Sequence, residues 1–296
     1  MSKLIKWPSI EQFRNVIRNV KHKTMFVSVD PTTQEPIYDR NRLQPTLKFR
    51  GTVKLHGTNA AVCERTHTGE LWAQSRENVL SETADNAGFY QFMKANEHSL
   101  RTIIAHAKVV FGVHAAWNKP YISIFGEWCG GNIQKGVAIT GLPKMFVLFG
   151  IAFADEEGNK TYLTEKQVED VVSQCRDFVG NDCIIKNIWD FKTFALDINF
   201  EDPHVAQNLL GEMTEAVEKS CPVGEALGSV GVGEGIVWRC IEEGWEDSAY
   251  WFKVKGLVHQ KQSAFTNLSV NPEIENQIKQ FLKENNASDF NFKFVE

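Results

Sequence analysis

The sequence lacks the features that mark several other classes of protein. Its six cysteines form no CxxC pair and no spacing typical of metal ligands, which indicates reduced, mostly buried thiols instead of a disulfide framework or a zinc site. It has no run of eighteen apolar residues and no apolar signal core at the N-terminus. We therefore expect no membrane partner and a cytoplasmic location.

Basic residues are not in excess either. The net charge is −5 over 296 residues, so any nucleic acid would have to contact a local basic groove and not a generally cationic surface. The length suffices for one large domain or two modest ones. A content of 43% hydrophobic and 23% charged residues is typical of a soluble globular protein. No low-complexity segment or internal repeat interrupts the chain.

A lysine stands at the end of a strand-like run. Apolar and polar residues alternate over residues 47–54, which predicts a half-buried strand with Lys54 on its polar face. Gly57 then allows a bend, and the apolar run over 60–63 follows, so Lys54 is held between two ordered segments. A hairpin with its turn at Thr68-Gly69 would bring Arg76 toward the same side as Lys54. A surface ion pair explains Arg76 equally well.

Two carboxylates stand among glycines at the ends of apolar segments. Glu127 ends a strand that begins near residue 121, where a carboxylate suits a sugar hydroxyl or a metal-bound water. Glu234 lies in a glycine-rich string at the head of another apolar strand. Taken alone, that string is more typical of a turn, and the strand after it excludes the helix of a dinucleotide fold. A third apolar strand, over 145–153, could present one aromatic side chain to a base.

Lys253 and Lys255 are two residues apart on a predicted strand and therefore share a face. Lysines on one face are commonly just solvated, but the apolar neighbours of this pair make a pocket wall a competitive alternative. A lysine attacks phosphorus only as the neutral amine, and with an ordinary pKa of ~10.4 it is neutral in roughly one molecule in a few thousand near pH 7. Burial and nearby cations lower that pKa. Lys253, Lys255 and a bound Mg²⁺ would supply positive charge to a lysine nucleophile that captures a nucleoside monophosphate and releases pyrophosphate.

The remaining predicted elements support packing. Ser9 with Gln12, and Thr164 with Gln167, have the spacing of helix capping boxes. The expected elements are a helix with apolar residues 10, 13, 17 and 20, a strand over 24–29, a loop over 32–45, one helix over 88–110, and a helix near Pro203 with Val205, Leu209, Met213 and Val217 on one face.

Six ordered motifs resemble those of the covalent nucleotidyltransferases, a superfamily of ATP-dependent RNA and DNA ligases and mRNA capping enzymes. The HGTN ending of the first motif is most similar to the RNA ligase 2-like family, because DNA ligases and capping enzymes more often carry aspartate where His56 stands. The resemblance covers roughly residues 49–256. The motifs are KLHGTN (54–59), SRE (75–77), FGEW (125–128), LFG (148–150), EGIVW (234–238) and WFKVKG (251–256).

The resemblance implies an α+β fold in which antiparallel sheets are flanked by helices. It implies an adenylyltransferase domain over 1–256, and the apolar spacing after that domain predicts a short helical tail over 257–296. The implied activity is that of an ATP-dependent RNA ligase, which joins 3′-hydroxyl and 5′-phosphate ends through a lysyl-AMP intermediate and an adenylated 5′ end. ATP and Mg²⁺ or Mn²⁺ would be the cofactors. The partner would be RNA with nicked or broken ends, or an RNA/DNA hybrid.

The resemblance also implies a role for each motif residue. Lys54 would carry AMP, and His56 and Asn59 would assist near the reacting phosphate. The other implied roles are the phosphate side and ribose for Arg76 and Glu127, adenine stacking for Phe149 with Phe146 as a second candidate, metal-assisted steps for Glu234, and the phosphates for Lys253 and Lys255.

The C-terminal region departs from the family pattern. About 40 residues follow Lys255, too few for the five-stranded nucleic-acid-binding barrel of many similar ligases. Asn271-Pro272 and the apolar spacing after it predict a docked helix, so an accessory protein is expected to help bind substrate. Three alternatives remain open: a DNA ligase, a capping guanylyltransferase, and a non-catalytic nucleotide- or RNA-binding module.

Overall fold

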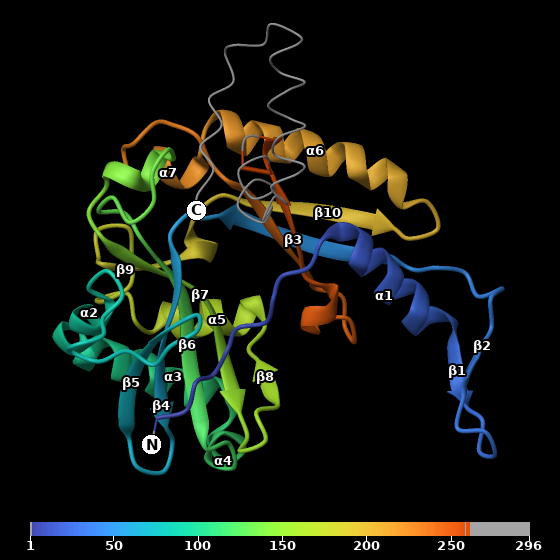
Figure 1. Cartoon of the computed structure of the whole chain (residues 1–296), viewed down its shortest axis with the longest axis horizontal. Helices are drawn as coiled ribbons and strands as arrows, with labels where there is room; N and C mark the ends of the chain where they lie inside the picture. Colours follow the sequence, from blue (N-terminus) through green and yellow to red (C-terminus); the bar gives the residue numbers. More distant parts are fainter. Residues whose placement is uncertain (1, 258, 261–296) are drawn as a thin grey trace, which may run out of the picture. The chain divides into compact units, whose positions relative to one another are not determined.

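Two β-sheets form the body of the chain up to Gly256, which is one compact unit (Figure 1). The computed structural model of the chain describes residues 2–257, 259 and 260. The helix predicted after Asn271 lies outside the described residues. The α+β class with antiparallel sheets flanked by helices is confirmed.

The first sheet has four antiparallel strands in the order β10-β3-β11-β12. Leu47, Phe49 and Val53 are buried on the core side, as their alternation predicts. Gly235 lies opposite both Lys54 and Lys255, so the ends of three strands meet at one glycine. The strands are β10 (Thr193–Asn199), β3 (Thr46–Lys54), β11 (Gly235–Cys240) and β12 (Phe252–Lys255).

The second sheet has the order β5-β4-β6-β7-β8, and β9 pairs with β7 in parallel. The predicted hairpin after Lys54 is confirmed as β4 and β5. The strands β6 and β7 are mostly apolar because both of their faces are buried. The strands are β5 (Glu70–Ser75), β4 (Thr58–Arg65), β6 (Tyr121–Cys129), β7 (Met145–Ala154), β8 (Lys160–Tyr162) and β9 (Ile185–Asn187).

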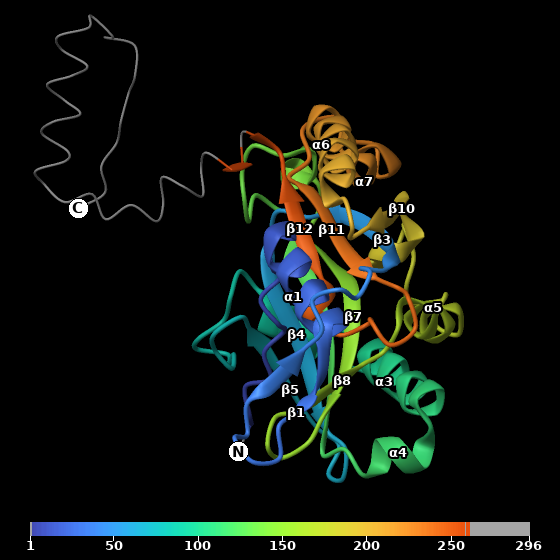
Figure 2. The same ribbon diagram turned by 90° about the vertical axis from the view of Figure 1, so that its right-hand side faces the viewer.

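Helices cover both sheets. Figure 2 shows α3 and α5 together on one side of the six-stranded sheet, and α6 beside the four-stranded sheet. The α-helices are α1 (Phe13–Met25), α2 (Phe89–Ala95), α3 (Glu97–Phe111), α4 (Val113–Trp117), α5 (Glu165–Ser173), α6 (Pro203–Lys219) and α7 (Pro222–Ala226). Short 3₁₀ helices are η1 (Ala138–Gly141), η2 (Ile188–Asp190) and η3 (Ser248–Tyr250).

The capping box of Thr164 and Gln167 is confirmed at the start of α5, and α6 begins at Pro203 as predicted. The predicted cap at Ser9 is wrong. Helix α1 begins at Phe13 after Gln12, and the Ser9 hydroxyl instead accepts a hydrogen bond from Arg76 at 3.1 Å.

Three other helix and loop predictions need correction. The single helix expected over 88–110 is two helices, because the backbone leaves the helical region at Asn96 (φ −114°, ψ 21°). Part of the loop expected over 32–45 is β2 (Pro36–Tyr38), which pairs with β1 (Phe26–Val29). Helix α6 buries Ala206, Leu210, Thr214 and Val217, whereas Val205 and Leu209 of the predicted face are exposed.

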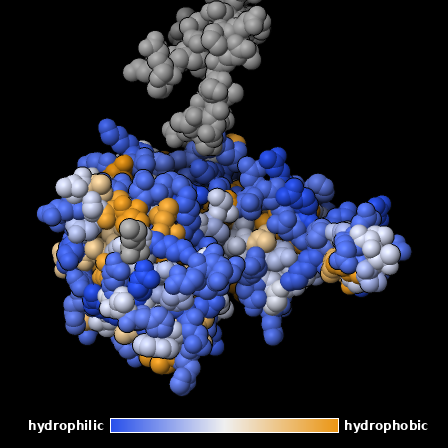
Figure 3. Space-filling view, turned by 60° about the horizontal axis from the view of Figure 1, so that its bottom comes forward, coloured by the Kyte–Doolittle hydropathy of each residue, from blue (hydrophilic) through white to orange (hydrophobic). Residues whose placement is uncertain are grey.

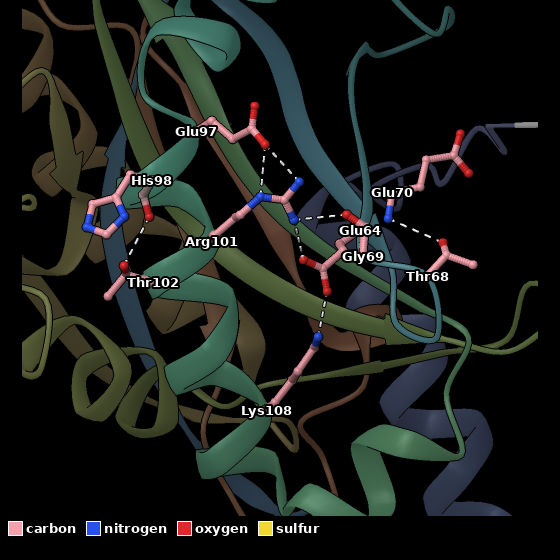
Figure 4. Close-up of polar contacts among 9 residues, drawn as sticks. All are labelled: Glu64, Thr68, Gly69, Glu70, Glu97, His98, Arg101, Thr102 and Lys108. Atoms are coloured by element: carbon pink, nitrogen blue, oxygen red, sulfur yellow. Dashed lines mark hydrogen bonds and ion pairs between the residues drawn. The ribbon is translucent and has the colours of Figure 1, made fainter.

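An ionic cluster fastens α3 to the β4–β5 hairpin (Figure 4). The carboxylate of Glu64 on β4 is 4% exposed and accepts hydrogen bonds from Arg101 at 3.3 Å and Lys108 at 2.5 Å. Arg101 also donates to Glu97 and to the carbonyl of Gly69. The cluster fixes the six-stranded sheet against its helices, away from the cavity described below.

The β1–β2 pair forms an arm that projects from the body (Figure 1). Every residue of both strands is exposed, and Figure 3 shows apolar surface on this projection. Among the described residues, no helix has the length and apolar character needed to cross a membrane. All six cysteines are free thiols and five of them are buried, which confirms that prediction.

Candidate active site

A cavity of about 360 Å³ lies between the two sheets. This volume is within the usual range of small-molecule sites, roughly 300–1,000 Å³. Six of the nine predicted site residues line it, and they come from both sheets: Lys54, Asn59, Arg76, Glu127, Phe149 and Lys253. The other three, His56, Glu234 and Lys255, adjoin it through the ion pairs described next.

Glu234 is the centre of a charged network beside Lys54. Its Oε2 lies 2.7 Å from Lys54 Nζ and 3.3 Å from His56 Nδ1, and its Oε1 lies 3.0 Å from Lys255 Nζ. The register explains the network, because Gly235 lies opposite Lys54 on one side and Lys255 on the other. The carboxylate before that glycine therefore faces both lysines.

This network keeps Glu234 ionised even though its side chain is only 2% exposed. Burial opposes ionisation, but the hydrogen bond from His56 and the charge and hydrogen bonds of Lys54 and Lys255 outweigh it. Together they hold the pKa of Glu234 well below its usual range. Glu234 is thus a fixed anion that orients the Lys54 amine.

The pKa of Glu127 is shifted in the opposite direction from that of Glu234. Burial raises the pKa of Glu127 to about 7, against the attraction of Lys54 and a hydrogen bond from the Gly57 amide at 3.0 Å. Glycine is required at 57 because a Cβ there would lie 2.5 Å from the carbonyl oxygen of Trp128. The bend at residues 56–58 therefore places the Gly57 amide within hydrogen-bonding distance of Glu127, at the cavity wall.

The cavity lining contains a cluster of cations, in which Lys253 and Arg76 join Lys54. Burial, followed by the charges of Lys54, Lys255 and Arg76, lowers the pKa of Lys253. Arg76 is the most exposed of these cations, with a side chain 54% exposed. An anionic group such as a triphosphate would relieve the repulsion among these charges.

Another part of the cavity lining is apolar and aromatic. Phe149 lines it, whereas Phe146, the second candidate, is fully buried against Phe89 and Phe92. Of the two candidates, therefore, only Phe149 faces the cavity. The other apolar lining residues are Trp7, Pro8, Ile10, Val53, Leu55, Val147, Ile188 and Val237.

Two parts of this lining were not predicted from the sequence. The segment before α1 contributes Trp7, and nothing in its spacing indicated a pocket. Arg239 also lines the cavity. The alternation of β11 could have revealed it, because Arg239 shares a strand face with Val237.

The protein oxygens do not form a ready metal site. The described residues contain no group of three or more His, Cys, Asp and Glu side chains that could hold a metal ion. Both oxygens of Glu234 face cationic nitrogens. Since Mg²⁺ in phosphate sites takes few protein ligands and several phosphate and water oxygens, a cation here would arrive with a triphosphate. The metal role of Glu234 stays a prediction.

A family model described as RNA ligase matches residues 47–255, most of the chain. The chain belongs to the RNA ligase family. This membership confirms the family resemblance, and the matched range contains all nine predicted site residues.

Solved structures with a similar fold agree. Two mutants of an RNA ligase from Naegleria gruberi, one with AMP and Mn and one without ligand, have TM-scores of 0.52 and 0.53 at 18% and 19% identity. A third mutant, with ATP and Mn, has a TM-score of 0.51 at 18% identity. Each match covers 88% of this chain but only 59% of the other. A search of curated proteins finds no match.

Proposed function

We propose that this RNA ligase family member is an ATP-dependent ligase that joins RNA ends through an adenylated Lys54. One observation carries the proposal. The Lys54 amine, oriented by ionised Glu234 at 2.7 Å, lines a cavity whose wall also holds the cations Lys253 and Arg76 and the aromatic rings of Trp7 and Phe149. Cations for phosphates and aromatic rings for a base are the groups that a nucleoside triphosphate requires.

In the first step, Lys54 Nζ attacks the α-phosphorus of ATP. A P–N bond forms, the bond from the α-phosphorus to the bridging oxygen breaks, and pyrophosphate leaves. Attack requires the neutral amine, so Lys54, whose side chain is 23% exposed, first gives a proton to a water molecule. Lys253, Lys255 and Arg76 stabilise the negative charge of the triphosphate as it transfers. A divalent cation held by the triphosphate supplies further positive charge, and the similar Naegleria gruberi ligase contains ATP and Mn.

In the second step, a 5′-phosphate oxygen of RNA attacks the same phosphorus. The P–N bond breaks, Lys54 takes up a proton from water and leaves as the amine, and AMP is joined to the RNA end through a new P–O–P linkage. In the third step, the 3′-hydroxyl of a second end attacks the 5′-phosphate, loses its proton, and expels AMP. His56 and Asn59 assist near the reacting phosphate.

The aromatic part of the cavity lining selects and holds the base. Phe149 stacks on adenine, and Glu127 contacts the ribose hydroxyls. A protonated carboxyl group can donate a hydrogen bond to a hydroxyl oxygen and an ionised one can only accept. The pKa of Glu127, about 7, leaves both modes available near neutral pH.

Labelling with ATP that carries a radioactive α-phosphate tests the first step. We expect the wild type to acquire an acid-labile label and Lys54→Ala to acquire none. Lys48→Ala is the matched control, because Lys48 lies on the same strand but is exposed and outside the cavity. Equal labelling of the two variants would contradict the proposal, and labelling by GTP alone would favour a guanylyltransferase.

Sealing assays test the later steps. We expect joining of nicked RNA and of RNA on an RNA/DNA hybrid, and no joining when only DNA strands are supplied. Labelled protein that seals no substrate alone but seals RNA after addition of a cell extract would support the need for an accessory protein. A preference for nicked DNA would replace the RNA assignment with a DNA ligase.

A further inference from the structure

Phe149 lies at an irregularity in β7. Next to it, Phe125 of β6 pairs with Gly150 and Gly126 pairs with Leu148, so Phe149 is an extra residue with no partner on β6. Such a bulge redirects a side chain and leaves the backbone of the extra residue without its usual ladder. Among the described strands, β8 and β9 pair with other residues of β7. The carbonyl oxygen of Phe149 needs another donor.

Arg239 supplies that donor. Its Nη2 donates a hydrogen bond to the Phe149 carbonyl oxygen at 2.9 Å, from the neighbouring sheet. Such a bond from a charged group is stronger than a neutral one. The Phe149 carbonyl beneath the proposed stacking surface is therefore held by a side chain of β11, while Leu148 and Gly150 on either side pair with β6.

Three tryptophans fix the Arg239 guanidinium. Its central carbon lies 5.2 Å from the Trp7 ring, 5.4 Å from the Trp189 ring and 4.7 Å from the Trp251 ring. The residue is 7% exposed, and its Nε has no hydrogen-bond partner in the structure. Burying a guanidinium is costly, and this cage offsets part of that cost while it restricts the side chain to one orientation.

The cage also touches the ring of Phe149. Trp7 packs edge-on against Phe149 with ring centroids 5.2 Å apart, and it stacks on Trp251 at 5.3 Å. Arg239 thus acts on both the main chain and the ring environment of one cavity residue. It also lines the cavity itself.

We propose that Arg239 is a positioning residue, which holds the β7 bulge so that the Phe149 ring faces the base of the bound nucleotide. This inference rests on the proposed function. Base stacking contributes equally to substrate and transition state, since the reaction takes place at the phosphate end. Loss of Arg239 should therefore raise the ATP concentration needed for half-maximal labelling and leave the maximal rate of Lys54 labelling nearly unchanged.

A double-mutant cycle tests the inference, with Arg239→Met, Phe149→Ala and both changes together. Each single change should raise the half-saturating ATP concentration about tenfold, the value expected for weakened base stacking. If Arg239 acts through Phe149, the half-saturating ATP concentration of the double variant should be no higher than that of Phe149→Ala. Arg239→Lys, which keeps the charge, replaces Arg239→Met in the cycle if the latter does not fold.

Arg50→Lys is the matched structural control. Arg50 lies opposite Arg239 in the sheet and its guanidinium lies 5.1 Å from the same Trp189 ring, but it is outside the cavity and pairs with Glu165 and Glu169. We expect it to lower the melting temperature without changing the ATP dependence. A rise in half-saturating ATP equal to that of the Arg239 variants would overturn the positioning role.

Two further outcomes would overturn the inference. In the first, the increases in half-saturating ATP caused by the two single changes multiply in the double variant. In the second, the Arg239 variant has a lower maximal labelling rate and an unchanged half-saturating ATP concentration. Calorimetric measurement of ATP binding to the wild type and to the same variants separates this inference from the proposed function. If the wild type binds ATP but is never labelled, the proposed function fails and the cycle is read from dissociation constants. If the wild type binds no ATP, both fail.

Discussion

Lys54 Nζ and Glu234 Oε2 lie 2.7 Å apart although 180 residues separate them in the sequence. The pairing of β3 with β11 brings them together, since Gly235 lies opposite Lys54. The proposed nucleophile is therefore oriented by the register of a sheet and not by a local turn. A slip of one residue would turn Glu234 away from Lys54.

Glu234→Gln should destabilise the protein at neutral pH and strongly reduce labelling. The change removes the anion that faces Lys54, His56 and Lys255, and breaking a buried ion pair costs roughly 3–5 kcal/mol. Because the folded-state pKa of Glu234 is lowered, its stabilisation is present above the unfolded pKa and is lost as pH falls. Denaturant unfolding from pH 7 to pH 3 should show the difference from wild type shrinking.

Glu64→Gln is the control for that experiment. Glu64 is also a buried carboxylate with two cationic partners, but it lies in the cluster of Figure 4 and not at the cavity. We expect it to lower the stability while the folded fraction labels normally. A constant difference between Glu234→Gln and wild type at every pH would contradict the first prediction.

Glu127→Gln should show the opposite pH dependence. Burial raises the pKa of Glu127 to about 7, so its contribution to stability is present below the unfolded pKa and is lost as pH rises through 7. The glutamine keeps an oxygen for the Gly57 amide but never ionises. The free energy of unfolding of the variant, relative to that of the wild type, should therefore rise by up to about 3 kcal/mol between pH 4 and pH 8. Unfolding curves at these two values measure the gain, and parallel curves for the two proteins would refute it.

Lys253→Met should weaken ATP binding most at neutral pH. The pKa of Lys253 is lowered by burial and by neighbouring cations, so the lysine loses its charge at a lower pH than usual. At pH 7.5 the variant should bind ATP about tenfold to a hundredfold more weakly, because it lacks one charged hydrogen bond. Toward pH 10 the difference should narrow. Calorimetric titrations measure both effects, with Lys48→Met as control, and a difference that widens with pH would count against the role of Lys253.

The placement of several proposed site residues could be predicted because it follows from short-range patterns. The alternation of β3 placed Lys54 on the polar face, and the two-residue spacing placed Lys253 and Lys255 on one face. The contact between Lys54 and Glu234 could not be deduced in this way. It depends on which strands pair and in what register, and the glycines around Glu234 are equally typical of a turn.

The direction of Phe149 was also beyond sequence periodicity. In a regular strand, Phe149, Ile151 and Phe153 would share a face, but the bulge separates them. Ile151 and Phe153 enter the core with Phe146, while Phe149 lines the cavity. An extra residue cannot be located from alternation when nearly every residue of the strand is apolar.

One predicted helix boundary and one predicted helix face were wrong for a related reason. Asn96 interrupts a continuous apolar period between α2 and α3, and its intrinsic helix propensity is only moderately low. In α6, two neighbouring sets of apolar residues each had helical spacing. Contacts with the sheet decide between them, and these buried Leu210 and left Leu209 exposed.

Gly150→Ala should reduce both stability and ATP affinity. A Cβ at Gly150 would lie 2.3 Å from a ring carbon of Trp7, so the indole must move. Overpacking of this kind costs about 1–3 kcal/mol. Trp7 lines the cavity and packs against Phe149, so its displacement should also raise the half-saturating ATP concentration in the labelling assay. Gly141→Ala is the control, because a Cβ there meets no atom within 4 Å. If both alanine variants unfold and label alike, the close approach of Trp7 to β7 does not shape the nucleotide site.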